Sequence, residues 1–287
     1  MSRDRHGKPV RSWRTRLLSV AIALAVGLAA GQILAQETRL PRHEWTTMLA
    51  PSVADAPEEF GPRAPWTIRV VLVIVGLSIW HTTQRMLGER QPASVDHAER
   101  AARFLSEHDR LLCLTEPANR FLNDHPRWAN ALLLVSSLLI DGLGLFLFVW
   151  SMVGPSIRPF LGLCILFGLR QVCQVLTALP PPPGSIWRSP GFPSLFVTYG
   201  VSNDLFFSGH TALAVYGAVE LAGLGSIWLM GLATAIAIFE TTAVLLLRVH
   251  YTMDVFAGLM AALYVAGVAA WLASPCDRVL AYAFAAS

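Results

Sequence analysis

Long apolar stretches separated by polar segments make up most of the chain. Seven of them approach the roughly 20 residues that a helix needs to cross a bilayer. They lie at 17–35, 65–85, 129–153, 157–179, 205–223, 226–247 and 251–272. Most of the tryptophans stand near the ends of these stretches, where an amphipathic ring prefers the boundary between lipid and water. The pattern predicts an all-α fold, a polytopic membrane helix bundle with six core transmembrane helices plus an N-terminal apolar helix.

The polar segments divide the chain into three regions. Residues 1–64 combine a basic N-terminal segment, the first apolar helix and a loop, and that helix is either a signal peptide or an uncleaved anchor. Residues 65–272 form the membrane-embedded core, and residues 273–287 form a C-terminal tail. Within the core, the polar segment 86–128 contains "SVDHAERAARFLSEHDRLLCL", which has the spacing of an amphipathic helix on the membrane surface.

The composition places the chain outside the soluble globular proteins. Hydrophobic residues make up 54% of it and charged residues only 14%. The net charge of +3 is too small to suggest a nucleic-acid partner, and the basic residues form no stripe. The four cysteines have neither the pattern of a disulfide framework nor a zinc-type spacing, and there is no P-loop. We therefore expect a multi-pass integral membrane protein without a metal or other cofactor.

Two histidines stand at the polar boundaries of predicted helices. His210 lies in "FSGHT" near the start of one apolar stretch, and His250 lies in "RVHYTMD" just after the end of the next. The first helix runs to a turn at "GLG", residues 223–225, and the second returns from it. Each leg has about 20 residues, or 30 Å. The return helix therefore ends where the first began, and the two histidines are predicted to meet.

Asp254, four residues after His250, adds a carboxylate on the same helix face. A carboxylate that accepts the proton of one ring nitrogen leaves the lone pair of the other available for nucleophilic attack. A second histidine opposite, His210, can give or take a proton near neutral pH. The alternative is that both histidines only form hydrogen bonds at helix ends. Their convergence with Asp254, beside a Ser-Gly turn and an arginine, favours a catalytic site.

The same segments resemble the motifs of a known group of lipid enzymes. "FSGHT" and "HYTMDV" are similar to the two histidine motifs of the lipid-phosphotransferase branch of the type 2 phosphatidic acid phosphatase superfamily. This branch contains the sphingomyelin synthases and the plant phosphatidylcholine:diacylglycerol cholinephosphotransferases. "RQVCQVLTALPPPPG", residues 170–184, adds an arginine nine residues before a Leu-Pro-x-Pro turn, as in both groups. The resemblance covers roughly residues 119–272.

The resemblance implies an activity and a role for each motif residue. The reaction would move a phosphocholine-type group from a phospholipid donor to a diacylglycerol- or ceramide-type alcohol. His250 would be the nucleophile that forms a phosphohistidine, Asp254 would orient it, and His210 would protonate the departing lipid alcohol. Asp204 resembles the sphingomyelin synthases, whereas Arg248 and the segment "ANRFL" resemble the plant cholinephosphotransferases. The resemblance is thus divided between the two groups, and the two features shared with the plant enzymes favour a glycerolipid acceptor.

Two departures separate the chain from the phosphatases of that superfamily. Their Lys-x6-Arg-Pro motif is absent, and so is their Ser-Arg pair before the second histidine, where Val244 stands six residues ahead of His250. Head-group transfer is therefore favoured over hydrolysis. A lipid phosphate phosphatase with water as acceptor is one alternative, and a non-catalytic lipid-binding membrane protein is another. A CDP-alcohol phosphotransferase is disfavoured because its D-G-x2-A-R…D-x3-D signature is missing.

Arginines are expected to hold the phosphate oxygens, so that no metal is needed. Ser208 and the backbone at Gly209 would add hydrogen bonds, and Tyr251 with Trp187 would enclose a quaternary ammonium group. The candidate substrate-binding residues are Arg170, Asp204, Ser208, Gly209, Arg248 and Tyr251.

Arg170 also has a structural alternative. It lies well inside a predicted span, where an arginine usually needs a buried partner, and Glu220 and Glu240 are predicted at a similar depth.

The membrane face that carries the histidines is left open. The arginine counts place it on the cytoplasmic side, whereas the resemblance places it on the exoplasmic or luminal side.

Overall fold

The computed structural model describes residues 66–88, 95–177, 179–191, 194–197, 199 and 206–284. Within these ranges the chain forms eight helices and no strand. The helices are α3 (Trp66–Gly88), α4 (Val95–His108), α5 (Arg110–Asp124), α6 (Pro126–Val153), α7 (Arg158–Leu176), α8 (Gly209–Ala222), α9 (Ile227–Leu246) and α10 (Thr252–Phe284). The predicted all-α class is confirmed. The apolar stretch at 17–35 and the candidate residue Asp204 lie outside the described residues.

Five of the described helices are long and apolar enough to cross a membrane, namely α3, α6, α7, α9 and α10. The chain is therefore a multi-pass integral membrane protein. α8 covers the remaining predicted core stretch but has only 14 residues, which is about 21 Å of helix against roughly 30 Å of hydrocarbon. Only five of the six expected core spans are therefore long enough among the described helices. The sixth, α8, is short because Ser208 caps it and the helix begins only at Gly209.

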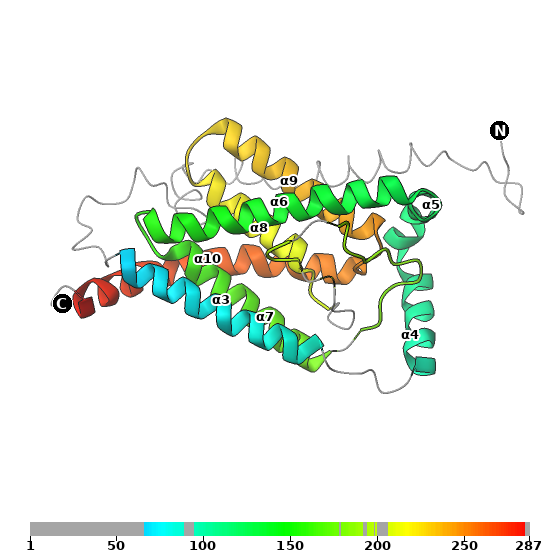
Figure 1. The fold of residues 1–287 in the computed structure, drawn as a ribbon, viewed down its shortest axis with the longest axis horizontal. Helices are drawn as coiled ribbons and strands as arrows, with labels where there is room; N and C mark the ends of the chain where they lie inside the picture. The colour runs from blue at the N-terminus through cyan, green and yellow to red at the C-terminus, as the bar shows by residue number, and fades with distance from the viewer. Residues whose placement is uncertain are drawn as a thin grey trace, which may run out of the picture.

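The helices pack as one bundle in which α8 is central, between α6 and α10, and α9 packs along α8 (Figure 1). The α8–α9 hairpin closes at residues 223–225, where Gly225 adopts a φ of 78°. α10 packs against α7 and α8, and α6 packs against α3, α7, α8 and α9. Leu166 and Tyr216 are fully buried between these helices. A Cβ at Gly162 would lie 1.9 Å from the Tyr216 hydroxyl oxygen, so glycine is what lets α7 approach α8 here.

The two carboxylates expected near Arg170 have other partners. Arg158 donates to Glu220 Oε2 from Nη2 at 2.7 Å and from Nε at 3.2 Å. Glu240 Oε2 accepts a hydrogen bond from the Ser136 hydroxyl at 2.7 Å. The structural alternative, in which Glu220 or Glu240 is the partner of Arg170, is therefore not seen, since each carboxylate is bonded to a residue of a neighbouring helix.

The predicted amphipathic surface helix is in fact two helices, α4 and α5, which meet at Asp109. Asp109 Oδ1 accepts hydrogen bonds from the backbone N–H groups of Leu111 and Leu112, both at 3.2 Å, and so caps α5. This local bonding competes with a continuous helix, which is why the helix breaks there. Leu112 is fully buried and packs against Val244 and Tyr251. Figure 1 shows α4 and α5 across the end of the bundle where α6 begins.

α10 continues through the predicted end of the core at residue 272 to Phe284. A proline within a helix removes one hydrogen bond, yet Pro275 does not end α10. The carboxylate of Asp277, half a turn later, accepts hydrogen bonds from the Ser156 hydroxyl and, at 3.0 Å, from the Ile157 N–H. Arg69 of α3 lies 3.8 Å from the same carboxylate. Residues 273–284 of the expected tail are therefore helical and tied to the turn between α6 and α7.

Candidate active site

His210 and His250 line the same narrow cavity, which has a volume of about 60 Å³. His210 is the second residue of α8, and His250 lies in the short segment between α9 and α10. Arg170 of α7 and Trp187 line the same cavity. The hairpin thus brings the two histidine motifs together, as its predicted geometry required.

The turn before α8 is fixed against the start of α10. The Ser208 N–H donates a hydrogen bond to the Asp254 carbonyl at 3.0 Å. Gly258 of α10 lies so close that an added Cβ would be 2.6 Å from the Ser208 carbonyl oxygen. Phe207 adopts a φ of 78°, a left-handed conformation that costs a non-glycine residue about 1 kcal/mol or more. The surrounding contacts hold this turn, which determines where α8 begins.

A buried carboxylate lies behind His250. The distance from His250 Nδ1 to Asp254 Oδ2 is 3.8 Å, an ion-pair distance that is longer than a hydrogen bond. The two residues are 3% and 1% exposed. Asp254 Oδ2 also accepts the Tyr251 N–H at 2.9 Å, while Oδ1 is buried without a hydrogen-bond partner among the described residues. A carboxylate so placed lies beside one ring nitrogen of His250 and can orient the imidazole.

The guanidinium of Arg170 passes close to the start of α8. Its Nε donates to the Phe207 carbonyl at 3.3 Å, and a Cβ at Gly209 would lie only 3.0 Å from that nitrogen. His210 is half-buried, and its ring meets that of Trp187 edge to face at a centroid distance of 5.7 Å. A guanidinium and two imidazoles therefore border one cavity, which suits an anionic group.

One helix, α8, begins at this cavity, which its first residue Gly209 lines. Its N-terminal end carries the positive end of the helix dipole, which attracts phosphate. The hydroxyl of Ser208 caps this helix, because it accepts the Thr211 N–H at 3.3 Å and donates to the Thr211 hydroxyl at 3.0 Å. Ser208 is fully buried in this capping role, and Gly209 is the residue of the pair that lines the cavity.

Arg248 and Tyr251 hold the proline-rich turn that follows α7. Arg248 donates to the Pro183 carbonyl at 2.8 Å and to the Leu112 carbonyl of α5 at 3.1 Å. The Tyr251 hydroxyl donates to the Pro180 carbonyl at 3.0 Å. Burial raises the pKa of Tyr251 to about 12, so the hydroxyl stays a donor at neutral pH. Both side chains were expected at the substrate, and the structure places their polar atoms on this turn instead.

A protein-family model described as AtPDCT1/2 matches residues 108–271 of the chain. The chain belongs to the AtPDCT1/2 family. This is a family of phosphatidylcholine:diacylglycerol cholinephosphotransferases, which are membrane enzymes of phospholipid metabolism. The matched residues include both histidine motifs and Arg170. No curated protein and no solved structure that was compared with the chain matches it.

One residue that positions the site of this AtPDCT1/2 family member was missed in the sequence. Asp109 caps α5 and also reaches the start of α10, where Oδ2 accepts the Thr252 N–H at 2.7 Å and Oδ1 accepts the Thr252 hydroxyl. A single carboxylate thus joins a surface helix to the helix that carries Asp254. The only signal in the sequence was an aspartate within an amphipathic pattern, which does not indicate a partner 143 residues away.

We expect Asp109→Ala to lower the free energy of unfolding by about 2 kcal/mol, because two helix starts lose a cap worth roughly 1 kcal/mol each. Thermal unfolding in detergent measures this loss. Asp109→Asn is the matched comparison, since its one amide oxygen can still cap α5 whereas its NH2 group cannot accept the Thr252 N–H, so it should lose only about half as much. An alanine variant that unfolds at the wild-type temperature would contradict the double capping role.

Proposed function

We propose that the chain transfers phosphocholine from a phospholipid to the hydroxyl of a diacylglycerol through a phosphohistidine at His250. The observation that carries this proposal is the convergence of His210 and His250 on one cavity, with Asp254 3.8 Å behind His250. Two imidazoles, one of them backed by a carboxylate, provide a nucleophile and a separate proton carrier. Membership of the AtPDCT1/2 family supports the choice of substrates.

In the first half-reaction, the phosphodiester of the donor lies between the two histidines. The lone pair of His250 Nε2 attacks phosphorus, and the bond from phosphorus to the glycerol oxygen breaks with its electron pair on that oxygen. Protonated His210 gives its proton to the same oxygen, so that neutral diacylglycerol leaves. Asp254 offsets the positive charge that the attacked imidazole acquires.

The second half-reaction reverses these steps with a new alcohol. The hydroxyl of a second diacylglycerol gives its proton to His210 while its oxygen attacks phosphorus. The bond from phosphorus to His250 then breaks, and the electron pair returns to the ring nitrogen. The products are a new phospholipid and an enzyme in its starting protonation state, so the exchange consumes neither water nor a net proton.

Arg170 is proposed to hold the phosphate oxygens together with the N-terminus of α8. We expect Arg170→Lys to lower kcat by about 10²-fold, because an ammonium group cannot hold two oxygens in one planar fork. Steady-state rates in detergent micelles measure this effect. Arg188→Lys is the matched control, since Arg188 is exposed and bonds Asn130. A lysine variant with full kcat per folded molecule but lower thermal stability would show that Arg170 serves the structure rather than the phosphate.

The test of the proposed function uses purified wild-type protein and His250→Ala in detergent. Fluorescent diacylglycerol or ceramide is mixed with unlabelled phosphatidylcholine, and lipid chromatography separates the products. We expect fluorescent phosphatidylcholine from diacylglycerol with the wild type alone. Fluorescent sphingomyelin would instead identify ceramide as the acceptor, and soluble phosphocholine or phosphate would identify a lipid phosphatase that uses water. If no product forms with any head-group donor, the result would favour a non-catalytic lipid-binding protein.

A further inference from the structure

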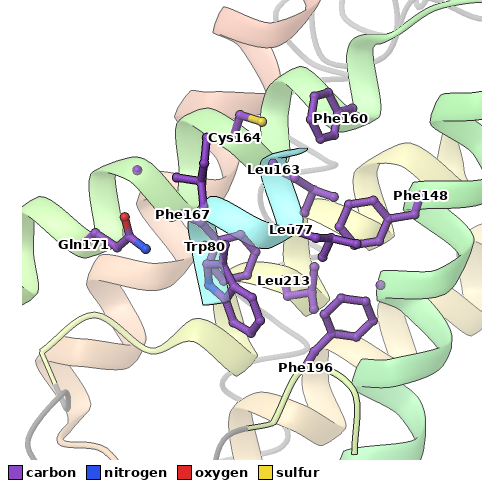
Figure 2. Close-up of a pocket in the computed structure, with 14 residues that line it drawn as sticks. Leu77, Trp80, Phe148, Phe160, Leu163, Cys164, Phe167, Gln171, Phe196 and Leu213 are labelled. Carbon is purple, nitrogen blue, oxygen red and sulfur yellow. The ribbon is translucent and has the colours of Figure 1, made fainter. Parts of the chain in front are cut away.

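An apolar cavity of about 290 Å³ lies among α3, α6 and α7, beside the histidine cavity. Aromatic and aliphatic side chains dominate its lining (Figure 2), among them Leu77 of α3, Phe148 of α6, and Phe160, Leu163 and Phe167 of α7. The three helices are all long and apolar enough to span a membrane. The cavity therefore lies at a depth where acyl chains are the surrounding solvent.

The two cavities share part of their walls. Trp80, Phe167, Phe196 and Leu213 line both the apolar cavity and the cavity that holds His210 and His250. A ligand with a polar head between the histidines can therefore extend an apolar part into the neighbouring space without leaving the protein. A glycerolipid has this division, with its ester groups at the junction.

Trp80, which lines both cavities, gives a second reason to expect a glycerolipid there. Its N–H is buried and has no hydrogen-bond partner among the described residues. Buried tryptophan N–H groups normally find an acceptor, and an unsatisfied one calls for an explanation. The ester carbonyl of a glycerolipid is an acceptor that belongs at this depth, between the phosphate and the acyl chain.

We propose that the apolar cavity binds an acyl chain of the glycerolipid whose head group or hydroxyl lies between His210 and His250. The proposal rests on the proposed function and adds to it the site for the lipid tail. In the exchange, the group that leaves in the first half-reaction and the group that enters in the second are both diacylglycerols. One tail site therefore serves both the donor and the acceptor.

Gly168 of α7 provides a way to fill this cavity. It lines the cavity, it is exposed to the surroundings, and a Cβ added there meets no atom within 4 Å. Gly142 of α6 is a matched control, because it is also exposed and open but does not line the cavity. Gly168→Ala, →Leu and →Trp form a graded series, and Gly142→Leu and →Trp accompany it.

The head-group exchange assay is run on each variant with dioleoyl and with dihexanoyl lipids. We expect Gly168→Trp to slow exchange of dioleoyl lipids by about tenfold or more, a size typical of steric exclusion from an apolar pocket. Exchange of the dihexanoyl lipids should change little, and the Gly142 variants should match the wild type with both. Equal rates of the Gly168 series and the wild type on dioleoyl lipids would overturn the tail site. The exchange measured in that same experiment would still support the proposed function.

A second measurement decides the matter if the Gly168 variants misfold or if the wild type shows no transfer. Wild-type protein is irradiated with diacylglycerol that carries a diazirine at the end of one acyl chain, and the labelled peptides are identified by mass spectrometry. Labels concentrated on the cavity residues of α3 and α7, such as Leu77 and Phe167, support the tail site. Labels spread evenly over the lipid-facing residues of all spans, α9 included, overturn it.

Discussion

Protein in which His250 is changed to Gln is expected to lose phosphocholine transfer by about 10⁴-fold or more, as enzymes do when their nucleophile is removed. Glutamine keeps a polar side chain of similar reach but has no lone pair able to attack phosphorus. Wild-type protein given labelled phosphatidylcholine without an acceptor is expected to retain label on His250. Mass spectrometry of the peptide that contains residues 248–254 would locate the phosphocholine group.

The control for His250 is His108→Gln, because His108 is exposed at the end of α4 and bonds only the Phe104 carbonyl in the described structure. Both variants should show the thermal unfolding temperature of the wild type. Label on another residue, or full transfer by His250→Gln, would contradict the assignment of the nucleophile. If His250→Gln loses both transfer and folding, the smaller variant His250→Asn is tested instead, because its side chain still forms hydrogen bonds. A folded asparagine variant without transfer would support the assignment.

Changing His210 to Gln is expected to slow transfer by about 10²- to 10⁴-fold, the usual contribution of a general acid and base. The size of the loss should depend on the leaving group. With 4-nitrophenyl phosphocholine, the departing phenolate needs no proton, so formation of the intermediate should be nearly as fast as in the wild type. With phosphatidylcholine, the departing alkoxide does need the proton, and the full loss should appear.

This dependence on the leaving group separates His210 from His250. The first burst of nitrophenol from His210→Gln should match the wild type, whereas His250→Gln should release none. If His210→Gln slows both substrates equally, then His210 acts by positioning the phosphate rather than by carrying the proton. Stopped-flow absorbance at the wavelength of nitrophenolate measures both cases.

The topology could be predicted because hydropathy shows how many helices there are and in which order, and a hairpin of two apolar helices returns the chain to one face. This argument brought His210 and His250 to a single cavity. It gives the position of a backbone and not the direction of a side chain. Arg248 and Tyr251 stand next to His250 in the sequence, yet their polar atoms bond the carbonyls of Pro183 and Pro180.

Contacts between segments that are distant in the sequence also could not be predicted. Arg158 and the buried Glu220 form a pair at the far end of α8 from His210, and neither hydropathy nor spacing shows which arginine a buried glutamate meets. The continuation of α10 past Pro275 has the same origin, since Asp277 bonds the turn between α6 and α7. Such features depend on tertiary packing, which overrides the local signal of a proline.

The α8–α9 hairpin fixes the number of residues that the chain can place between its two histidines. One residue inserted into α9 would move everything after it by about 1.5 Å along the axis and turn it by about 100°. His250 would then leave the cavity, although the hydropathy plot of the chain would hardly change. Two membrane proteins with the same hydropathy plot therefore need not share a chemistry, and the register of this hairpin is as much a part of the site as the imidazoles themselves.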